Sequence, residues 1–365
     1  GDTITNPDGS EQKVLQIFPH TNHQFYKITF NDGTTCEAGE EHLWVSWKAS
    51  KEGKKLERLK REGVIPDKFS LYPENAEIVT TSGLMDWLER GYNPLIPVTK
   101  PVQYTKPVGK WIPVDPYVLG FLIGDGCITS ENITYTRDLL DVESDDHFLN
   151  SGFKLSSTRQ EKMSVRLNKC LERDKLIKEL KATDLLGKKS VDKFIPNKYL
   201  YLPIKDREAL LQGLMDTDGT VSSKGGLSFT TVSKELSDNI TQLIQSLGGW
   251  ASVSTREPTY TYEGEKRVGQ LAYTLYIKLP DQITPFRLKR KLERLVPNKG
   301  RLYRTVVSIE KSRKCDGRCI TVSNPNRLYL LDNFIVTHNT FAILLDILRH
   351  MSDPNYTGVV FRRTS

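Results

Sequence analysis

Apolar and polar residues alternate near both ends of the chain. Residues 14–18 and 25–30 show this alternation, and a period of two residues is typical of half-buried strands. The turn sequences at residues 6–9 and 31–33, Asn-Pro-Asp-Gly and Asn-Asp-Gly, predict hairpins beside these strands. Strand patterns resume at residues 303–309. We therefore predict one all-β module that is built from both ends of the chain.

The middle of the chain predicts two apolar helices with the same layout. Residues 116–126 and residues 210–219 are both rich in apolar residues, and each segment ends in a carboxylate followed by glycine. Glycine is a common C-terminal stop for a helix. The repeat therefore places Asp125 and Asp218 at the ends of two similar helices. Two such carboxylates close together would form an oxygen-rich divalent-metal site.

Small residues in these helices predict that the helices pack on each other. Gly120 and Gly124 lie four residues apart in the first helix, as do Gly213 and Thr217 in the second. Small side chains at this spacing allow two helix backbones to approach closely. One such segment alone fits an ordinary core helix equally well, and the repetition favours the helix pair.

Alternating segments also flank the two helices, at residues 133–136, 164–167, 227–232 and 273–278. Antiparallel strands with one polar face are able to lie in the major groove of DNA and contact base edges. A solvated hairpin is the alternative for any one of them. The residues expected on the DNA-facing side are Arg137, Arg166, Arg256, Lys266, Arg267, Lys278, Tyr260, Tyr262, Tyr273 and Tyr276.

The composition fits a protein that meets a polyanion. Of the 365 residues, 52 are Lys or Arg, and the net charge is +7, which is compatible with nucleic-acid binding without proving it. The sequence has no run of about 18 apolar residues, so no membrane span is expected. Five scattered cysteines argue against a disulfide framework and for a reducing cytoplasm. We expect a monomer.

Two segments delimit an inserted domain. Residues 76–110 are rich in proline in their second half and predict a connector. Residues 285–295 predict a basic amphipathic helix that closes the domain. We therefore expect a mixed fold, in which an all-β domain formed by residues 1–110 and 296–339 carries an α+β domain with two helical repeats at residues 111–295.

The two helical segments resemble the LAGLIDADG motifs of homing endonucleases. The second segment is closer to the motif, since Ile123 in the first replaces an acidic residue. Residues 193–196, Lys-Phe-Ile-Pro, resemble a further block of that family. The resemblance implies Mg²⁺-dependent cleavage of double-stranded DNA. It also implies that Asp125 and Asp218 hold the metal, and that Lys193 assists the attacking water or stabilises phosphate charge.

A second motif lies near the C-terminus, where an apolar run at residues 330–336 precedes Thr337-His338-Asn339-Thr340. The side-chain amide of Asn339 is able to close on its own backbone carbonyl, with a histidine before it and a hydroxyl nucleophile after it. This tetrapeptide resembles the C-terminal splice junction of an intein. A surface turn after a buried strand is the alternative, since Asn and Thr are common in turns.

The start of the chain resembles other intein blocks with two departures. Gly1 stands where an intein usually has a Cys or Ser nucleophile, so either the chain was cut short or another residue is the nucleophile. His42, beside Trp44, lies where the second block carries the histidine that polarises the upstream scissile amide, although Gly39 replaces its usual Thr. A core histidine is the alternative. If nothing precedes Gly1, only cleavage after Asn339 is possible.

A cysteine replaces the usual Asp in the block before the junction. This residue is Cys319, and Leu328 replaces a later His of the same block. Trp44, Cys319 and Thr337 together are similar to the class 3 inteins, in which an internal Cys is the first nucleophile. The resemblance implies that Trp44 and Thr337 shape the pocket in which the splicing reaction takes place. It also implies an all-β horseshoe fold of the Hint type.

The class 3 resemblance implies a reaction that needs no cofactor. Cys319, as the thiolate, attacks the carbonyl that precedes the intein, since a thiolate is nucleophilic near neutral pH and leaves easily. The acyl group passes to Thr340, and Asn339 then cyclises with help from His338. An O-to-N shift restores the peptide. A small buried residue is the alternative for Cys319.

Residues 340–365 follow the junction and are expected to belong to the host protein. Thr340 begins an amphipathic helix pattern, as does the Thr that follows the Lys of a phosphate-binding loop. This segment resembles the start of the ATPase domain of a phage terminase large subunit, with the intein interrupting the loop.

Two alternatives to a splicing homing endonuclease stay open. One is a DNA endonuclease whose splicing half is defective, which Gly39 and Leu328 favour. The other is a maturase-like nucleic-acid-binding protein with an inactive metal site, which Asp125 and Asp218 argue against.

Overall fold

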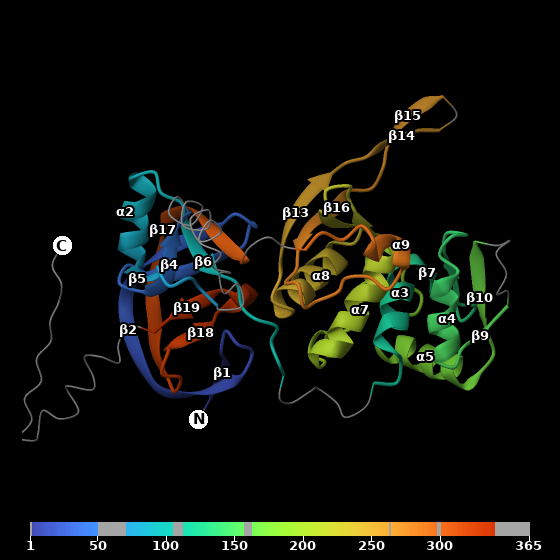
Figure 1. The fold of residues 1–365 in the computed structure, drawn as a ribbon, viewed down its shortest axis with the longest axis horizontal. Helices are drawn as coiled ribbons and strands as arrows, with labels where there is room; N and C mark the ends of the chain where they lie inside the picture. Colours follow the sequence, from blue (N-terminus) through green and yellow to red (C-terminus); the bar gives the residue numbers. More distant parts are fainter. Residues whose placement is uncertain are drawn as a thin grey trace, which may run out of the picture. The chain divides into compact units, whose positions relative to one another are not determined.

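The chain divides into two compact units. One is Gly1–Thr99 with Tyr303–Ser365, and the other is Lys100–Leu302 (Figure 1). We call them the β unit and the inserted unit. The computed structural model describes residues 2–49, 71–104, 112–156, 163–262, 264–297 and 301–339. None of the helices in these ranges is long and apolar enough to cross a membrane.

The described part of the β unit is built on one nine-stranded sheet. Strands β2 and β17, each 20 residues long, pair antiparallel and lie side by side in Figure 1. The order is β1-β2-β17-β6-β4-β19-β18, with β3 on β2 and β5 on β4. The strands are β1 (Thr3–Thr5), β2 (Glu11–Phe30), β3 (Thr35–Gly39), β4 (Leu43–Lys48), β5 (Glu77–Thr80), β6 (Pro94–Pro97), β17 (Tyr303–Val322), β18 (Leu328–Leu330) and β19 (Val336–His338).

The sheet nearly closes on itself, because its end strands β1 and β18 are in contact. Nε2 of Gln12 on β2 donates to the carbonyl oxygen of Leu328 on β18 at 2.6 Å. Both predicted turns are confirmed, with Gly9 and Gly33 at φ of 90° and 84°. Short strands are found near the N-terminus as β1, β3 and β4, whereas the alternating runs at residues 14–18 and 25–30 form one long strand, β2, that continues through Pro19. Its long partner β17 pairs on both sides of that proline in regular register, with Arg318 opposite Pro19.

Much of the segment expected to be a connector belongs to the β unit. Helix α2 (Thr81–Glu89) lies between β5 and β6, and Oγ1 of Thr80 caps its start by accepting from the backbone N–H of Gly83 at 3.0 Å. Leu84 and Trp87 of α2 are buried in the core with Trp44. The predicted boundary at residue 110 therefore lies at residue 99 in the structure, because these apolar residues complete the core of the β unit.

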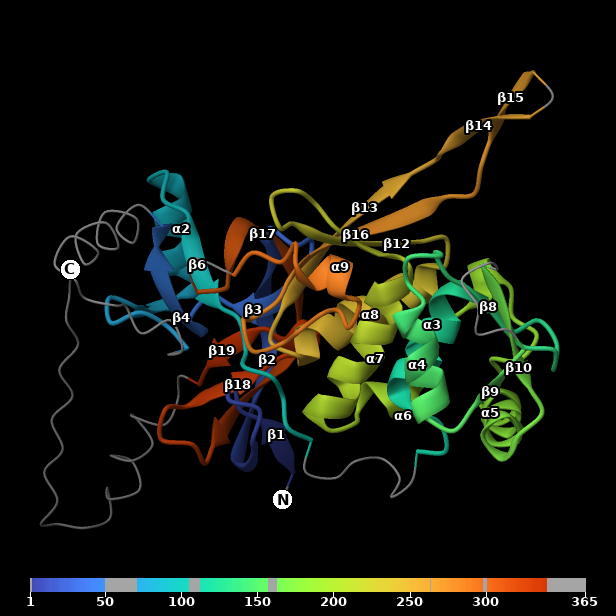
Figure 2. The same ribbon diagram turned by 45° about the vertical axis from the view of Figure 1, so that its right-hand side comes forward.

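The inserted unit contains one arrangement twice. Helix α3 (Pro116–Asp125) leads into the sheet β7-β8-β10-β9, and helix α7 (Ile204–Thr217) leads into the sheet β11-β12-β16-β13. The hairpin β14–β15 projects beyond the second sheet (Figure 2). The remaining bounds are β7 (Gly126–Cys127), β8 (Thr134–Thr136), α4 (Glu143–Asn150), β9 (Lys154–Leu155), β10 (Ser164–Asn168), α5 (Leu171–Ala182), α6 (Asn197–Leu200), β11 (Gly219–Val221), β12 (Leu227–Thr231), α8 (Lys234–Ser246), β13 (Trp250–Arg256), β14 (Thr259–Tyr262), β15 (Glu265–Val268), β16 (Ala272–Lys278) and α9 (Lys289–Leu292). The four strands predicted beside the helices are confirmed as β8, β10, β12 and β16.

Helices α3 and α7 pack against each other, and their glycines allow the contact. A methyl group on Gly120 would lie 2.3 Å from the carbonyl oxygen of Leu210. One on Gly213 would lie 2.1 Å from the carbonyl oxygen of Tyr117. No side chain fits at such distances, so the predicted close approach of the two helices is confirmed.

We expect Gly213→Ala to destabilise the inserted unit by about 3 kcal/mol or more, because the methyl group collides with a backbone carbonyl that cannot rotate away. Alanine is intrinsically better in a helix by only about 0.5–1 kcal/mol, so the collision dominates. Urea unfolding would measure the change. Gly226→Ala is the control, since its methyl group would meet only Oγ of Ser222, at 3.1 Å. Equal stability of the two variants would contradict the close packing.

Gly126 caps the end of α3, as predicted, and Gly219 follows Asp218, the C-cap of α7. Gly126 has φ −82°, outside the left-handed region. A methyl group there would lie 2.3 Å from the carbonyl oxygen of Leu122, and one on Gly219 would lie 2.4 Å from that of Met215. Glycine is therefore needed because the chain folds back tightly on the helix end, and not because of a left-handed turn.

The predicted helix at residues 285–295 is mostly absent. Only Lys289–Leu292 forms a helical turn, α9. The preceding Phe286 and Leu288 are buried, and the backbone N–H groups of Arg287 and Leu288 donate to the carboxylate of Asp216. These contacts hold the segment extended up to α9.

Candidate functional sites

Two carboxylates lie at the ends of the paired helices. Asp125 is the last residue of α3, and Asp218 directly follows α7. Both side chains reach solvent. Partial burial nevertheless raises the pKa of both carboxyl groups, that of Asp218 to about 6. The charge of Asp125 is the second cause at Asp218. The helix ends that carry the two carboxylates are in contact, since a methyl group on Gly124 would lie 1.9 Å from Oγ1 of Thr217.

A buried lysine lies at the end of each helix. Lys193 donates to three backbone carbonyls at the end of α3, and Lys291 donates to four at the end of α7, all at 2.7–3.3 Å. Helix ends leave such carbonyls without partners, so each ammonium satisfies them. Burial lowers the pKa of both lysines, that of Lys291 to about 8, while nearby carboxylates including Asp125 oppose the shift.

The sequence prediction selected Lys193 and missed Lys291. Lys291 belongs to a run with Arg287, Lys289 and Arg290, and nothing in that run distinguishes one cation from another. The internal repeat is the signal that would have found it, because each lysine follows its repeat's Asp-Gly at a similar separation along the chain.

The donor atoms fit a hard divalent cation. Mg²⁺ prefers oxygen ligands and is usually held by one or two carboxylates, with waters and substrate phosphates as its other ligands. Within the described ranges, no three His, Cys, Asp or Glu side chains cluster to hold a metal by themselves. Asp125 and Asp218 therefore fit an ion that takes its other ligands from water and the substrate.

A second aspartate of the same motif is not available as a ligand. Asp216 is 4% exposed and accepts from the hydroxyl of Tyr117 at 2.9 Å. It also accepts from the backbone N–H groups of Arg287 and Leu288 at 3.1–3.3 Å. Its carboxylate is thus committed to holding the segment before α9.

One of the predicted DNA-facing residues lies in the wrong place. Arg137 is 3% exposed, and its guanidinium pairs through two nitrogens with the carboxylate of Asp145, at 2.8 Å each. The prediction that it lies on the outer face is wrong, because Asp145 on α4 draws it inward. The hydroxyl of Tyr135 also donates to Asp145, at 2.6 Å.

The other predicted DNA-facing cations are exposed. They lie on β10, β13, β15 and β16, and they are Arg166, Arg256, Lys266, Arg267 and Lys278. Tyr276 is 55% exposed and Tyr273 is half-buried. Tyr260 and Tyr262 lie on the projecting strand β14, and their side chains are outside the described part of the structure.

A buried cluster forms where β4 meets β19 in the β unit. His338 on β19 pairs with Leu43 on β4, and Nε2 of His42 makes a short hydrogen bond with Oγ1 of Thr337. The ring of His42 lies edge-on to Trp44, with centroids 5.0 Å apart. The structure thus brings together two pairs of residues, His42 with Trp44 and Thr337 with His338, that are far apart in the sequence.

The two histidines of this cluster are held neutral. Burial, with a smaller effect of His338, lowers the pKa of His42 to about 4. Burial and the charge of Arg327 lower the pKa of His338. Nδ1 of His338 is buried without a hydrogen-bond partner among the described residues. A neutral ring with an open nitrogen is able to accept or share a proton.

Two further residues of the proposed junction, Cys319 and Asn339, lie within the described residues. Cys319 is half-buried on β17, where its backbone pairs with Phe18. After burial, Cys319 is the second cause of the raised pKa of Tyr329, and Tyr329 pairs with Thr337 on β19. Asn339 is 2% exposed. Its backbone N–H donates to the carbonyl of Arg327 at 2.9 Å. Thr340 and Gly1 lie outside the described residues.

One supporting residue was not found from the sequence. Oγ1 of Thr81 accepts from the indole N–H of Trp44 at 3.0 Å. The backbone N–H of Thr81 donates to the carbonyl of His42 at 2.9 Å. Thr81 therefore holds both residues of the second block, and a lone Thr at the start of a helix carries no sequence signal for that role.

We expect the β unit to lose stability as the pH falls from about 6.5 to about 4, by roughly 1–3 kcal/mol from His42. The unfolded chain binds a proton on this side chain in that window, whereas the folded chain excludes it, so protonation favours unfolding. Urea unfolding at about pH 7 and about pH 4.5 would measure the loss. His42→Gln should reduce this pH dependence, whereas replacing the exposed His20 by Gln should not. An unchanged pH dependence in His42→Gln would contradict the buried neutral ring.

Comparison with known proteins gives one family match within the inserted unit. Residues 195–283 match the family model described as "Homing endonuclease". This stretch contains α7, Asp218 and the second sheet, so the second repeat carries the match. It supports a DNA endonuclease, and hence a hydrolase.

A curated relative matches almost the whole chain. The replicative DNA helicase DnaB of Mycobacterium intracellulare is 27% identical over 367 residues, which cover 96% of this chain and 56% of that protein. The chain therefore spans about half the length of the relative it matches. The terminase prediction gains no support from this match, because the relative is a helicase.

Solved structures of one endonuclease also align with the chain. The structure of I-DmoI in complex with DNA and Mn is 15% identical and covers 46% of this chain and 89% of that chain, with a TM-score of 0.28. Mesophilic variants of I-DmoI are 17% identical and cover 47% of this chain and 91% of that chain, also with a TM-score of 0.28. At this TM-score the likeness adds nothing to the argument.

Proposed function

We propose that the inserted unit is a LAGLIDADG homing endonuclease that cuts both strands of a specific DNA duplex with Mg²⁺. The observation that carries this proposal is the helix pair α3 and α7. It places Asp125, Asp218, Lys193 and Lys291 together at the ends of two repeated structures. The family match over residues 195–283 supports the same class.

The four side chains divide into two equivalent pairs, one for each DNA strand. Asp125 and Asp218 are the groups that hold the divalent ion, which when bound activates water and neutralises charge at the phosphate. Lys193 and Lys291 bring a positive charge to each helix end, where it stabilises the negative charge that develops on the phosphate. With its pKa near 8, Lys291 is mostly protonated at neutral pH.

The two sheets provide the surface on which DNA would lie. Arg166 belongs to the first sheet, and Arg256 and Lys278 belong to the second. Lys266 and Arg267 extend this basic surface along the projecting hairpin β14–β15. Phosphate contacts of this kind position a protein on DNA, and base contacts from strands in the major groove give sequence specificity.

Cleavage of a randomised plasmid library tests the nuclease proposal. Incubation with Mg²⁺ and sequencing of the new ends should give one preferred site with cuts in both strands. Binding without any cut would favour the maturase-like alternative.

We propose further that the β unit is an intein of the class 3 type. The observation that favours this second function is the buried cluster of His42, Trp44, Thr337 and His338. Cys319 would attack the upstream carbonyl to form a thioester as the C–N bond of that amide breaks. His42 would polarise the amide or pass a proton to the leaving amine. The acyl group would then move to Thr340, and Asn339 would cyclise beside His338.

The host protein in this proposal is a replicative helicase. The relative that matches 96% of the chain bears that name, and residues 340–365 would be the first part of the downstream host segment. The helix predicted from Thr340 onward lies outside the described residues. Exchange of the downstream residues for those of an unrelated protein would test how far splicing depends on the host.

Expression with an added upstream segment tests the splicing proposal. Mass spectrometry should find the ligated flanks and a free intein that ends at Asn339. An unprocessed precursor would favour the alternative of an endonuclease with a defective splicing half.

A further inference from the structure

The segment that carries Lys291 is too short to be stable alone. Helix α9 has four residues, and a single turn does not form by itself in water. Its position must therefore come from contacts with other elements. Lys291 itself is 5% exposed, and its Nζ is aimed at the end of α7 through four backbone carbonyls.

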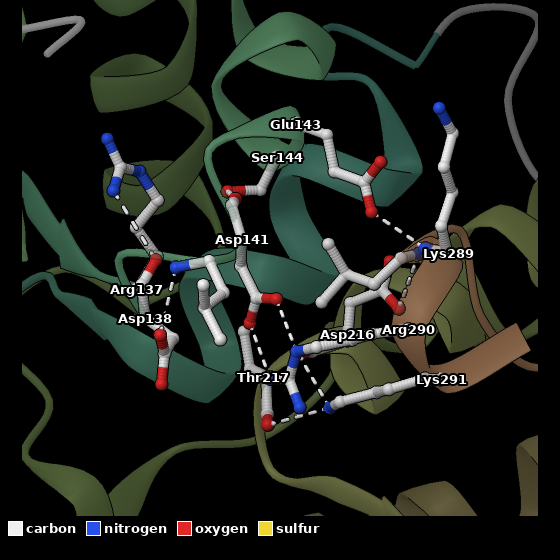
Figure 3. Close-up of polar contacts among 12 residues, drawn as sticks. Arg137, Asp138, Asp141, Glu143, Ser144, Asp216, Thr217, Lys289, Arg290 and Lys291 are labelled. Atoms are coloured by element: carbon white, nitrogen blue, oxygen red, sulfur yellow. Dashed lines mark hydrogen bonds and ion pairs between the residues drawn. The ribbon is translucent and has the colours of Figure 1, made fainter. Parts of the chain in front are cut away.

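Two acidic side chains of the first repeat hold α9 in place (Figure 3). Nη2 of Arg290 lies 2.6 Å from Oδ2 of Asp141, and Nε of Arg290 pairs with the other carboxylate oxygen. Oε1 of Glu143 accepts from the backbone N–H of Lys289 at 2.7 Å. Bidentate Arg–carboxylate pairs fix geometry as well as charge, and a carboxylate at the first turn of a helix satisfies its free N–H groups.

Hydrogen bonds within residues 138–144 hold the turn that carries Asp141 and Glu143. The backbone N–H of Asp141 donates to the carbonyl of Asp138 at 3.0 Å. Oγ of Ser144 donates to the carbonyl of Asp141 at 2.8 Å. Arg137, which anchors this turn through Asp145, also donates to the carbonyl of Asp138 at 3.4 Å. The side chain of Asp141 is only 7% exposed, so the carboxylate that pairs with Arg290 is largely shielded from water.

The segment of the other lysine is held by neutral groups. Oγ of Ser233 donates to the carbonyl of Lys193 at 2.6 Å, and Oδ1 of Asn239 accepts from the backbone N–H of Ile195 at 2.8 Å. Both partners belong to the second repeat. Each lysine segment is thus contacted by the opposite repeat, while Asp216 of the second repeat also holds the residues before α9. Of the contacts between repeats described here, only those to the α9 segment use carboxylates.

We infer that Asp141 and Glu143 are positioning residues of the first repeat that set Lys291 of the second repeat at its helix end. This inference rests on the proposed nuclease function for its effect on cleavage. One of the two strand cuts therefore depends on an ionic contact between the repeats, and the other does not.

Lysine labelling tests the positioning without any need for activity. The full chain is treated with formaldehyde and cyanoborohydride, and mass spectrometry gives the methylation rate of each lysine. In Asp141→Asn/Glu143→Gln we expect Lys291 to react about tenfold faster or more, because α9 opens locally, while Lys193 keeps its rate. Glu131→Gln is the control, since this exposed carboxylate pairs with Lys181 at 2.5 Å far from α9 in sequence. An unchanged rate at Lys291 would overturn the inference.

Strand-resolved cleavage tests the consequence. On a duplex that the wild-type chain cuts, labelled on each strand, the double variant should cut one strand about tenfold to a hundredfold more slowly and accumulate nicked DNA. An equal slowing of both strands would indicate general damage and overturn the inference. Glu143→Gln alone, at a half-buried side chain, gives a milder variant if the double variant unfolds. If the wild-type chain cuts nothing, the nuclease proposal fails, and the labelling result still decides the positioning.

Discussion

Asp218→Asn should reduce DNA cleavage by about a thousandfold or more while leaving DNA binding intact. A metal ion contributes several kcal/mol of charge stabilisation at a reacting phosphate, and each 1.4 kcal/mol is about tenfold in rate. The amide removes the charge that Asp218 offers to the cation and keeps the side-chain shape. Asp125→Asn should have an effect of the same order, because Asp125 ends the matching helix α3.

The measurement is single-turnover cleavage at saturating Mg²⁺, with binding followed separately. Removal of a negative charge beside the DNA should leave affinity unchanged or slightly higher, since it lowers repulsion from phosphate. Asp238→Asn is the matched control, because this exposed carboxylate on α8 is paired only with Lys234 among the ion pairs described. Cleavage that persists in both Asp125→Asn and Asp218→Asn would place the catalytic centre elsewhere.

Cys319→Ala should abolish ligation of the flanking segments, and Asn339→Ala should stop the reaction at a later stage. The first change removes the thiol that forms the initial thioester, so no acyl group reaches Thr340. The second change removes the amide that cyclises, so a branched intermediate should accumulate. Loss of a nucleophile typically costs several orders of magnitude in rate, about 10⁴–10⁶-fold.

Cys315→Ala is the matched control for this experiment. Cys315 is a second half-buried thiol on the same strand, β17, where it pairs with His23. Mass spectrometry of the products should show normal ligation in this variant. Ligated product in Cys319→Ala would mean that a residue upstream of Gly1 starts the reaction and would refute the class 3 mechanism.

The paired helices could be predicted because the constraint on them is local. Gly120 and Gly213 appear at fixed positions in two similar segments, and close helix packing is the usual reason for such spacing. The same holds for the turns at Gly9 and Gly33, where a few adjacent residues determine the backbone. Patterns of this kind need no knowledge of the rest of the chain.

Other features depend on partners that are distant in sequence. The alternation around Arg137 predicts only on which face of the strand its side chain lies. That the side chain is buried there follows from its ion pair with Asp145. Lys291 acquires its place from carbonyls of α7 and from Asp141. The residues next to Arg137 and Lys291 in the sequence do not reveal these partners. The prediction from the sequence therefore took Arg137 as exposed and did not select Lys291.

The long strand β2 shows the same limit. Each half of β2 reads as a short strand, and Pro19 between them favours a break. The partner β17 supplies hydrogen bonds on both sides of that residue. A continuous strand therefore results from pairing with a segment that begins at Tyr303.

The points where the chain leaves and re-enters the β unit are neighbours. Pro97 at the end of β6 pairs with Tyr303 at the start of β17, so the two attachment points already have the spacing of a hairpin. The entropy of closing a loop rises only slowly with its length, so the β unit is little affected by how much chain lies between them. A short turn in place of the inserted unit would leave the pairing of β6 and β17 intact. The β unit is therefore able to gain or lose such an insertion over evolution without rebuilding its sheet.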